Sequence, residues 1–97
     1  MYTISDEIAT QEYHDLLIKK IVESSSLEIL SITLEKEALF PDHTSPRDAE
    51  LIVLEGSIEF HINGDTYNLT QQQHFNFPKG TKHRVQALEN SKFLIIR

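Results

Sequence analysis

Two histidines, His43 and His83, are the side chains of this sequence best suited to chemistry in a pocket. Each stands beside turn-forming residues, His43 two positions after Pro41 and His83 directly after the Pro-Lys-Gly-Thr-Lys stretch of residues 78–82. A neutral imidazole can bind a transition metal or hydrogen-bond a small molecule. A solvated loop histidine at position 43, or a hydrogen-bonded core histidine at position 83, would give the same sequence. The elements that carry the two residues therefore decide what they can do.

Alternation of apolar and polar residues predicts strands through most of the chain after residue 26. The clearest alternation is at residues 57–63, and the short apolar run at 51–54 suits a strand covered on both faces. Asn63-Gly64 predicts a hairpin because both residues tolerate the positive φ of a type I′ turn. About seven strands at short regular spacing are expected, which is typical of a sandwich or barrel. The expected strands are residues 27–35, 51–54, 57–63, 66–69, 75–77, 82–88 and 92–96.

The N-terminal residues 1–26 are expected to form an extension and first strand of the same domain, which continues as a barrel over residues 27–97. Asp6 could cap a short helix, and a strand is then expected at about residues 16–23. This strand is well placed to pair with the sheet edge of a second copy, so a homodimer is expected. A chain of 97 residues has room for one core only.

Composition excludes several classes of function. Hydrophobic residues make up 39% of the chain, and no apolar run approaches the roughly 20 residues that span a membrane. The formal net charge of -6 repels nucleic-acid phosphates and acidic membrane surfaces, so neither is an expected partner. There are no cysteines, which excludes disulfides and thiolate sites. The acidic N-terminal residues do not resemble a secretory leader, so the expected location is the cytoplasm.

The positions of His43, Gly56, Pro78, Gly80 and His83 resemble the two sequence motifs of small single-domain cupins, and the resemblance covers residues 27–97. When Gly56 is aligned with the end of the first motif, His43 falls on the first histidine of that motif. Pro78, Gly80 and His83 fall on the same residue types in the second motif. The resemblance implies an all-β fold, a small double-stranded β-helix of the jelly-roll type with a short N-terminal extension.

The sequence departs from the cupin pattern at the metal ligands. Ser45 stands where the family has its second histidine and Ala49 where it has its glutamate, so two of the four usual ligands remain. Two imidazoles alone make a poor shell for Zn²⁺, Fe²⁺, Mn²⁺ or Ni²⁺, which want three or four protein ligands. A one-residue bulge could turn Asp48 or Glu50 inward as a third metal ligand beside the two histidines.

The strand parity that the resemblance implies gives a pocket of two histidines against a largely apolar wall. Its expected ligand-binding residues are His43, Ser45, Leu51, His83 and Val85.

Three functions remain open on this sequence. The first is a binding or sensory module that holds a small, mostly apolar organic molecule, oriented by the two histidines. The second is a metal-dependent enzyme, a dioxygenase, isomerase or lyase acting on a small organic acid or sugar, with His43 and His83 as metal ligands. The third is a dimeric scaffold whose pocket has decayed. Fold alone does not decide among them.

Overall fold

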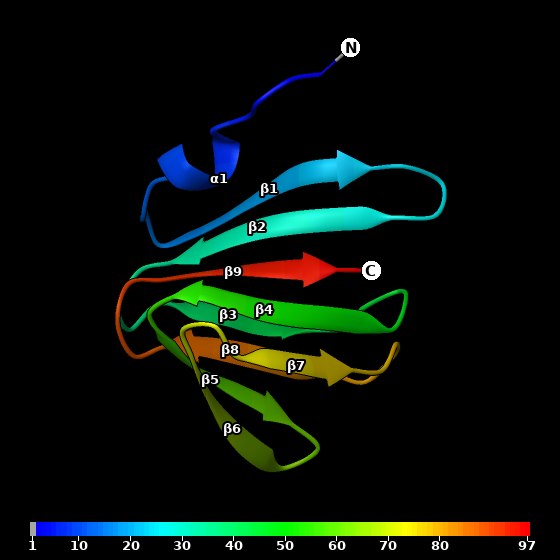
Figure 1. The fold of residues 1–97 in the computed structure, drawn as a ribbon. Coiled ribbons are helices and arrows are strands. Elements are labelled where there is room, and N and C mark those ends of the chain that lie inside the picture. The colour runs from blue at the N-terminus through cyan, green and yellow to red at the C-terminus, as the bar shows by residue number, and fades with distance from the viewer. Residues whose placement is uncertain (1) are drawn as a thin grey trace.

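The computed structural model describes residues 2–97 and consists of two antiparallel β-sheets packed face to face (Figure 1). Residue 1, where the expected N-terminal extension starts, lies outside the described residues. One sheet has the strand order β1-β2-β9-β4-β7 and the other has the order β3-β8-β5-β6. The all-β expectation is confirmed. In chain order the elements are α1 (Glu7–Thr10), β1 (Leu16–Glu23), β2 (Glu28–Leu34), β3 (Leu39–His43), β4 (Ala49–Glu55), β5 (Ser57–Ile62), β6 (Asp65–Thr70), β7 (His74–Phe77), β8 (His83–Ala87) and β9 (Ser91–Ile96).

The core lies between the two sheets and is built by the predicted alternation. In β5, Ile58, Phe60 and Ile62 are buried, while Glu59 and His61 between them keep partial exposure. β4 and β8 alternate in the same way, while β2 is buried on both faces, and the inner face of each sheet is apolar. The buried apolar residues are Leu30, Ile32, Leu34, Ala49, Leu51, Val53, Ile58, Phe60, Ile62, Leu69, Phe77, Val85, Ala87, Phe93 and Ile95.

The turn between β5 and β6 has the predicted conformation. Asn63 and Gly64 have φ angles of 53° and 76°. Two successive positive φ values are the signature of a type I′ hairpin, whose twist matches that of the flanking strands. The pairing of Ile62 with Asp65 follows directly.

One strand was missed by the sequence analysis. About seven strands were expected after residue 26, and the structure has eight, β2 to β9. The additional strand is β3, whose Pro41 and flanking polar residues had indicated a loop. Proline removes a ladder donor, and it is tolerated here because β3 forms an edge of its sheet. His43 is therefore the last residue of a strand, and the alternative of a loop histidine at this position is wrong.

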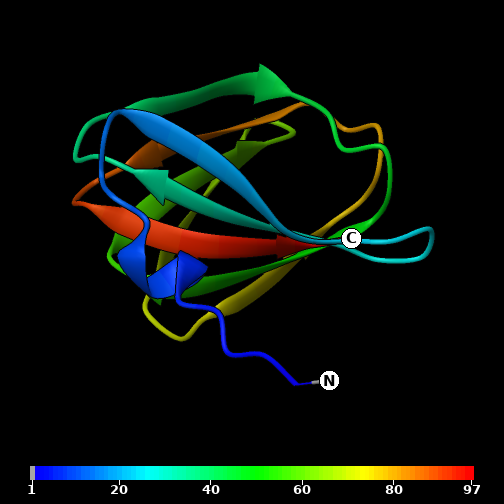
Figure 2. The same cartoon turned by 90° about the horizontal axis from the view of Figure 1, so that it is seen from above.

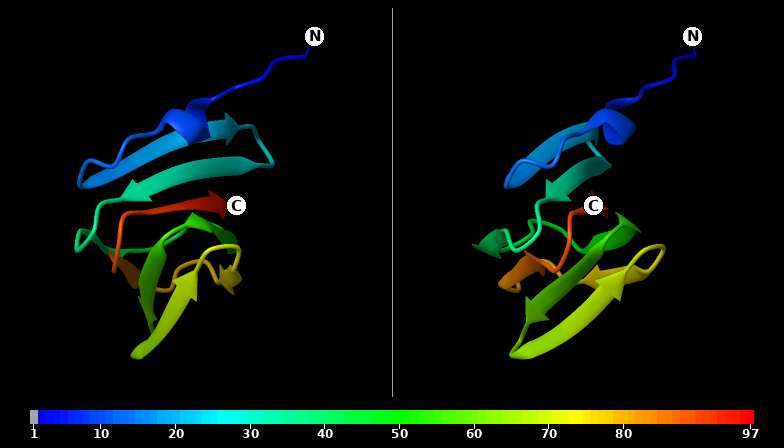
Figure 3. Two further views of the ribbon diagram at one scale, coloured as in Figure 1. Left: turned by 60° about the vertical axis from the view of Figure 1, so that its left-hand side comes forward. Right: turned by 90° about the vertical axis from the view of Figure 1, so that its left-hand side faces the viewer.

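The N-terminal residues lie across the outer face of the five-stranded sheet. Figure 2 shows α1 outside the layer formed by β1, β2 and β9, and Figure 3 shows it far from β6. The buried amide of Gln11 holds this segment down, because its Nε2 donates to the carbonyls of Leu17 and Ser31 at 3.2 and 3.0 Å. The strand expected at residues 16–23 is observed as β1, which pairs with β2. Within residues 2–97 no helix has the length and apolar character needed to cross a membrane.

Candidate functional site

His43 and His83 lie directly opposite each other in the ladder between β3 and β8. Their ring centroids are 4.2 Å apart and the rings meet edge to face at 65°. The two residues are forty positions apart in the chain, and the antiparallel pairing of an edge strand with its neighbour brings them together. The convergence that the resemblance implied is therefore present in the fold.

An irregularity in β3 turns His43 toward the interior. Phe40 pairs with Val85 and His43 pairs with His83, so three steps along β3 match two steps along β8. Successive strand residues alternate between faces, and one extra residue resets that alternation. Phe40 and His43 can therefore both face inward, although an unbroken strand would place them on opposite faces.

Both imidazoles are oriented by the same local contact. The Nδ1 atom of His43 lies 2.7 Å from the Pro41 carbonyl oxygen, and the Nδ1 atom of His83 lies 2.9 Å from the Thr81 carbonyl oxygen. A carbonyl can only accept, so each Nδ1 must carry the hydrogen and donate it. In the neutral ring Nε2 then carries the lone pair. Within residues 2–97 neither Nε2 atom forms a hydrogen bond.

Aromatic rings enclose the histidine pair. Phe40 stacks on His43 with centroids 4.0 Å apart, and Phe60 lies parallel to His83 at 5.2 Å. The Phe77 ring is tilted against His83, with centroids 4.5 Å apart. His83 is consequently 3% exposed. These contacts fix the ring planes and keep bulk water away from His83.

Burial lowers the pKa of the His83 imidazole below its ordinary value, because desolvation penalises the charged ring. The hydrogen bond to the Thr81 carbonyl opposes this shift, while the Coulombic effects of the neighbouring His43 and Arg97 side chains add to it. The Asp42 carboxylate opposes it as well. The neutral ring is favoured, so His83 presents an acceptor at Nε2.

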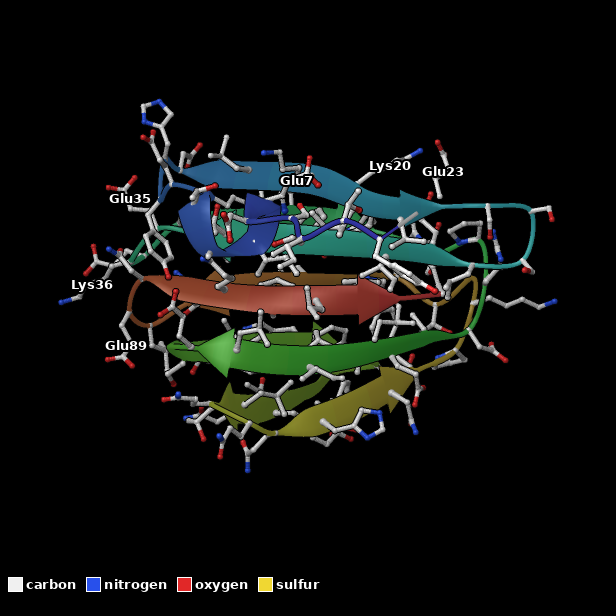
Figure 4. All side chains as sticks on the ribbon, turned by 45° about the horizontal axis from the view of Figure 1, so that its top comes forward. Glu7, Lys20, Glu23, Glu35, Lys36 and Glu89 are labelled. Atoms are coloured by element: carbon white, nitrogen blue, oxygen red, sulfur yellow. The ribbon has the colours of Figure 1, made fainter. Side chains whose placement is uncertain are left out.

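A cavity of about 230 Å³ opens beside the histidine pair, at the end of the barrel where β9 ends. Most of its wall is apolar, and two ionised side chains complete it, those of Lys20 and Arg97. Figure 4 shows Lys20 close to Glu23 near the end of β1, with both side chains directed away from the ribbon. The cavity is lined by Ile18, Lys20, Leu30, Ile32, Phe40, His43, Thr44, Phe60, Phe77, His83, Ile95 and Arg97.

The other residues expected in the pocket lie elsewhere. Leu51 and Val85 are buried in the core between the sheets and do not line the cavity. Ser45 is buried as well, but its hydroxyl donates to the Arg47 carbonyl at 2.6 Å and accepts from Arg97 Nη1 at 3.3 Å. Of the five expected ligand-binding residues, the structure brings His43 and His83 together on the cavity wall.

The two carboxylates considered as a third metal ligand do not join the histidines. The register of β4 with β7 runs without a bulge from Ala49 to Ile52, so Ala49 stays inward. Glu50 bonds His74 at 2.8 Å, and Asp48 accepts from the Lys79 amide at 3.0 Å. No group of three histidine, aspartate or glutamate side chains able to hold a metal occurs among residues 2–97. The donors present do not make the three- or four-ligand shell that a divalent transition metal wants.

A larger and more open hollow, of about 430 Å³, lies on the outer face of the four-stranded sheet beside the β5–β6 hairpin. Its wall includes charges of both signs, among them Asp42, Asp65 and Arg84. Arg84 Nη1 lies 4.0 Å from Asp42 Oδ1, so these charges partly satisfy each other. Neither His43 nor His83 lines this hollow. The smaller cavity is the one with convergent polar groups in an apolar wall, as a ligand site requires.

Several cavity residues were not identified from the sequence. Phe60 and Phe77 are buried in the core, and they also line the cavity wall. Lys20 and Arg97 carry no sequence signal, because β1 and the end of β9 meet at the cavity only through β2. Phe40 could have been found from its spacing to His43 only with knowledge of the bulge.

Comparison with known proteins gives the family of the fold. The family model described as a cupin domain matches residues 30–96. A conserved protein of unknown function from Streptococcus pyogenes, SPY1581, is 29% identical, with a TM-score of 0.78 over 88% of this chain and 75% of that chain. A cupin superfamily protein from Desulfitobacterium hafniense has a TM-score of 0.86 at 13% identity, covering 99% of this chain and 90% of its own.

A third solved structure bears on the fold class. An RmlC-like cupin family protein from Methanocaldococcus jannaschii, described as a double-stranded β-helix, has a TM-score of 0.78 at 19% identity. The match covers 84% of this chain and 78% of that chain. The expected double-stranded β-helix is confirmed. No functionally curated protein matches the chain at a significant level.

Proposed function

The chain belongs to the cupin domain family, and we propose on that premise that it binds a small organic molecule in the cavity beside His43 and His83. One observation carries this proposal. Two imidazoles are fixed through Nδ1 to backbone carbonyls, and both leave Nε2 without a partner among residues 2–97, on the wall of a mostly apolar cavity. Convergent polar atoms in an apolar recess are the usual composition of a small-molecule site.

The polarity of the histidine pair restricts the ligand. In neutral rings both Nε2 atoms accept hydrogen bonds, so the ligand must present a donor such as a hydroxyl or an amine. The rest of the ligand would lie against apolar side chains, among them Leu30, Ile32 and Phe60. Burial of that apolar surface supplies affinity, while the hydrogen bonds to Nε2 supply orientation.

Histidine side-chain NMR during titration with a panel of small hydroxylated compounds tests the proposal. Binding should be saturable and should shift the His83 Nε2 resonance. The variant H83F keeps an aromatic ring in the stacked position and removes the acceptor, so it should lose the binding. H61F is the matched control, because His61 lies on the adjacent strand β5 but does not line the cavity. Binding that H83F retains, or no saturable binding by any member of the panel, would contradict the proposal.

The metal-dependent enzyme is the alternative that His43 and His83 keep open. If it were correct, the two Nε2 atoms would be the metal donors, and further donors would have to come from the ligand or from water. Elemental analysis of protein purified without an affinity tag discriminates the two functions. A stoichiometric content of zinc, iron, manganese or nickel that H83F loses would favour the enzyme.

A further inference from the structure

The ionised side chains on the cavity wall are of one sign. Lys20 and Arg97 line the cavity, and no aspartate or glutamate does. This is against the composition of the chain, which has 15 acidic and 9 lysine or arginine residues. The acidic partners of these two cations, Glu23 and Glu28, lie outside the cavity wall. The wall therefore presents cationic side chains beside its apolar surface.

Arg97 is held in a fixed position by its own contacts. Its backbone pairs with Glu28 in both directions, and its Nε donates to Glu28 Oε1 at 2.7 Å. Nη1 donates to the Ser45 hydroxyl at 3.3 Å. Nη2 forms no hydrogen bond with any part of the chain between residues 2 and 97. A guanidinium oriented through two nitrogens and free at the third is prepared to donate to an anionic oxygen.

Glu28 fixes this cation from outside the cavity wall. The Arg97 guanidinium lowers the pKa of the Glu28 carboxyl, so the carboxylate persists near neutral pH. Lys20 Nζ lies 3.4 Å from the same carboxylate and 2.8 Å from Glu23. The Lys20 side chain is half exposed, so it can move to a ligand at the mouth, whereas the Arg97 side chain is 19% exposed. Arg97 is thus the principal anion contact and Lys20 an accessory one.

We infer that the ligand of this cavity is a small carboxylic acid with an apolar body, whose carboxylate is bound by Arg97 and assisted by Lys20. This inference rests on the proposed function and names the class of its ligand. The donors at Arg97 and Lys20 suit a carboxylate, and a hydroxyl on the same molecule can donate its hydrogen to one of the two acceptors, at His43 or at His83. A hydroxy acid with a ring or branched chain satisfies both ends.

The cavity volume limits the apolar body. A cavity of about 150 Å³ lined by leucine, isoleucine and phenylalanine is large enough for benzene. The cavity described above measures about 230 Å³. It can therefore hold one six-membered ring together with a carboxylate and a hydroxyl, and it falls below the roughly 300 Å³ at which drug-sized ligands begin.

Three probes test the assignment on the wild-type protein: mandelate, and two compounds that each differ from mandelate by one group. Mandelate carries a phenyl ring, a hydroxyl and a carboxylate, phenylacetate lacks the hydroxyl, and 1-phenyl-1,2-ethanediol has a neutral hydroxymethyl in place of the carboxylate. Isothermal titration calorimetry should find mandelate the tightest of the three. The diol should bind roughly 10- to 100-fold more weakly, which is the usual contribution of a hydrogen bond to a charged group.

Variants identify the residue responsible. R97Q should weaken mandelate by a similar factor and leave the diol unchanged, and retained diol binding shows that the cavity is intact. R97K keeps the charge but loses the planar fork, so it should weaken mandelate less than R97Q does. R84Q is the matched control, because Arg84 is an exposed arginine on the outer face and does not line the cavity; it should leave all three affinities unchanged.

The outcomes separate this inference from the proposed function. Equal affinities for mandelate and the diol in wild-type protein, or an R97Q effect that is the same for both, would overturn the carboxylate assignment while small-molecule binding stands. If none of the three probes binds and no compound of the hydroxylated panel binds either, both the carboxylate assignment and the proposed function would be overturned.

Discussion

The substitution Gly56→Ala should destabilise this fold more than the same change at its other exposed turns. Gly56 connects β4 and β5 with a φ of +91°. A Cβ at this position would lie 2.3 Å from Ser91 Oγ, 2.5 Å from the Asn90 carbonyl oxygen and 2.7 Å from Ser91 Cα. Two of these three atoms are backbone, so rotation of one side chain cannot remove the overlap. The turn before β9 would have to move away from the turn between β4 and β5.

The cost can be built from three contributions. A left-handed conformation costs a residue with a Cβ about 1–2 kcal/mol. Overpacking of a close contact adds about 1–3 kcal/mol. Ser91 Oγ accepts from the Ser57 amide at 3.0 Å and lies within donating distance of the Glu89 and Ser57 carbonyls, at 2.7 and 3.1 Å, and loss of the contacts to Ser57 would add about 1 kcal/mol. The expected destabilisation is therefore about 3–6 kcal/mol, a large share of the roughly 5–15 kcal/mol that stabilises an ordinary domain.

Urea unfolding and thermal melting measure this effect, with Gly64→Ala as the matched control. Gly64 has a φ of +76° and no heavy atom within 4 Å of its added Cβ, so its alanine variant should lose only the conformational contribution, about 1–2 kcal/mol. The midpoint of melting should fall by more than about 10 °C for Gly56→Ala and by clearly less for Gly64→Ala. Equal losses in the two variants would refute the argument from close approach.

Three further predictions follow from single contacts. Because the pKa of His83 is lowered in the folded chain, the unfolded chain takes up a proton near pH 6.5 that the folded chain does not. Stability should therefore decrease as the pH falls below about 6.5, by at most about 1.4 kcal/mol per pH unit for this residue. Urea unfolding at pH 7.5 and 5.5 should show a smaller pH effect in H83F than in the wild-type protein, and an unchanged pH effect would contradict the assignment. Gln11→Ala should cost about 1–3 kcal/mol, because the amide that donates to the Leu17 and Ser31 carbonyls is buried, whereas Thr10→Ala, an exposed neighbour, should cost less; equal urea midpoints would contradict this role. The edge strand β1 exposes Ile18 and Val22, so a homodimer through this edge is expected. Sedimentation at micromolar concentration should give about twice the 11.2 kDa of one chain, whereas a single 11.2 kDa species would contradict the homodimer.

The strands that could be predicted are those whose alternation is set by burial on one face. Residues 57–63 were located well because every second side chain of β5 is buried in the core, whereas β1, at residues 16–23, shows no such alternation in burial. The hairpin at Asn63 was predictable because few residues accept its φ. In each case the determining interaction is local in sequence.

The strand β3 was not predictable from its own residues. Pro41 lacks an amide hydrogen, and the extra residue between Phe40 and His43 breaks the period that identifies a strand. Pairing with β8 stabilises the segment, and that pairing is a tertiary contact. The position of His43 could be inferred from the resemblance to cupins, but the inward rotation of its side chain required the bulge.

The cationic side of the cavity illustrates why a site is harder to predict than a fold. The Nδ1 anchors of His43 and His83 are carbonyls two residues earlier, so each imidazole could be oriented by local conformation alone. Arg97 reaches the same cavity only because β9 lies between β2 and β4, and its orientation depends on Glu28, which is adjacent only through the β2–β9 ladder. A chain with an excess of acidic residues can therefore have cationic side chains as the only ionised groups on the wall of a recess, because Glu28, which fixes Arg97, lies outside that wall. The charge of the ligand should therefore be inferred from the side chains that the strand order brings to the cavity wall, because the net charge of the whole chain is a poor guide to it.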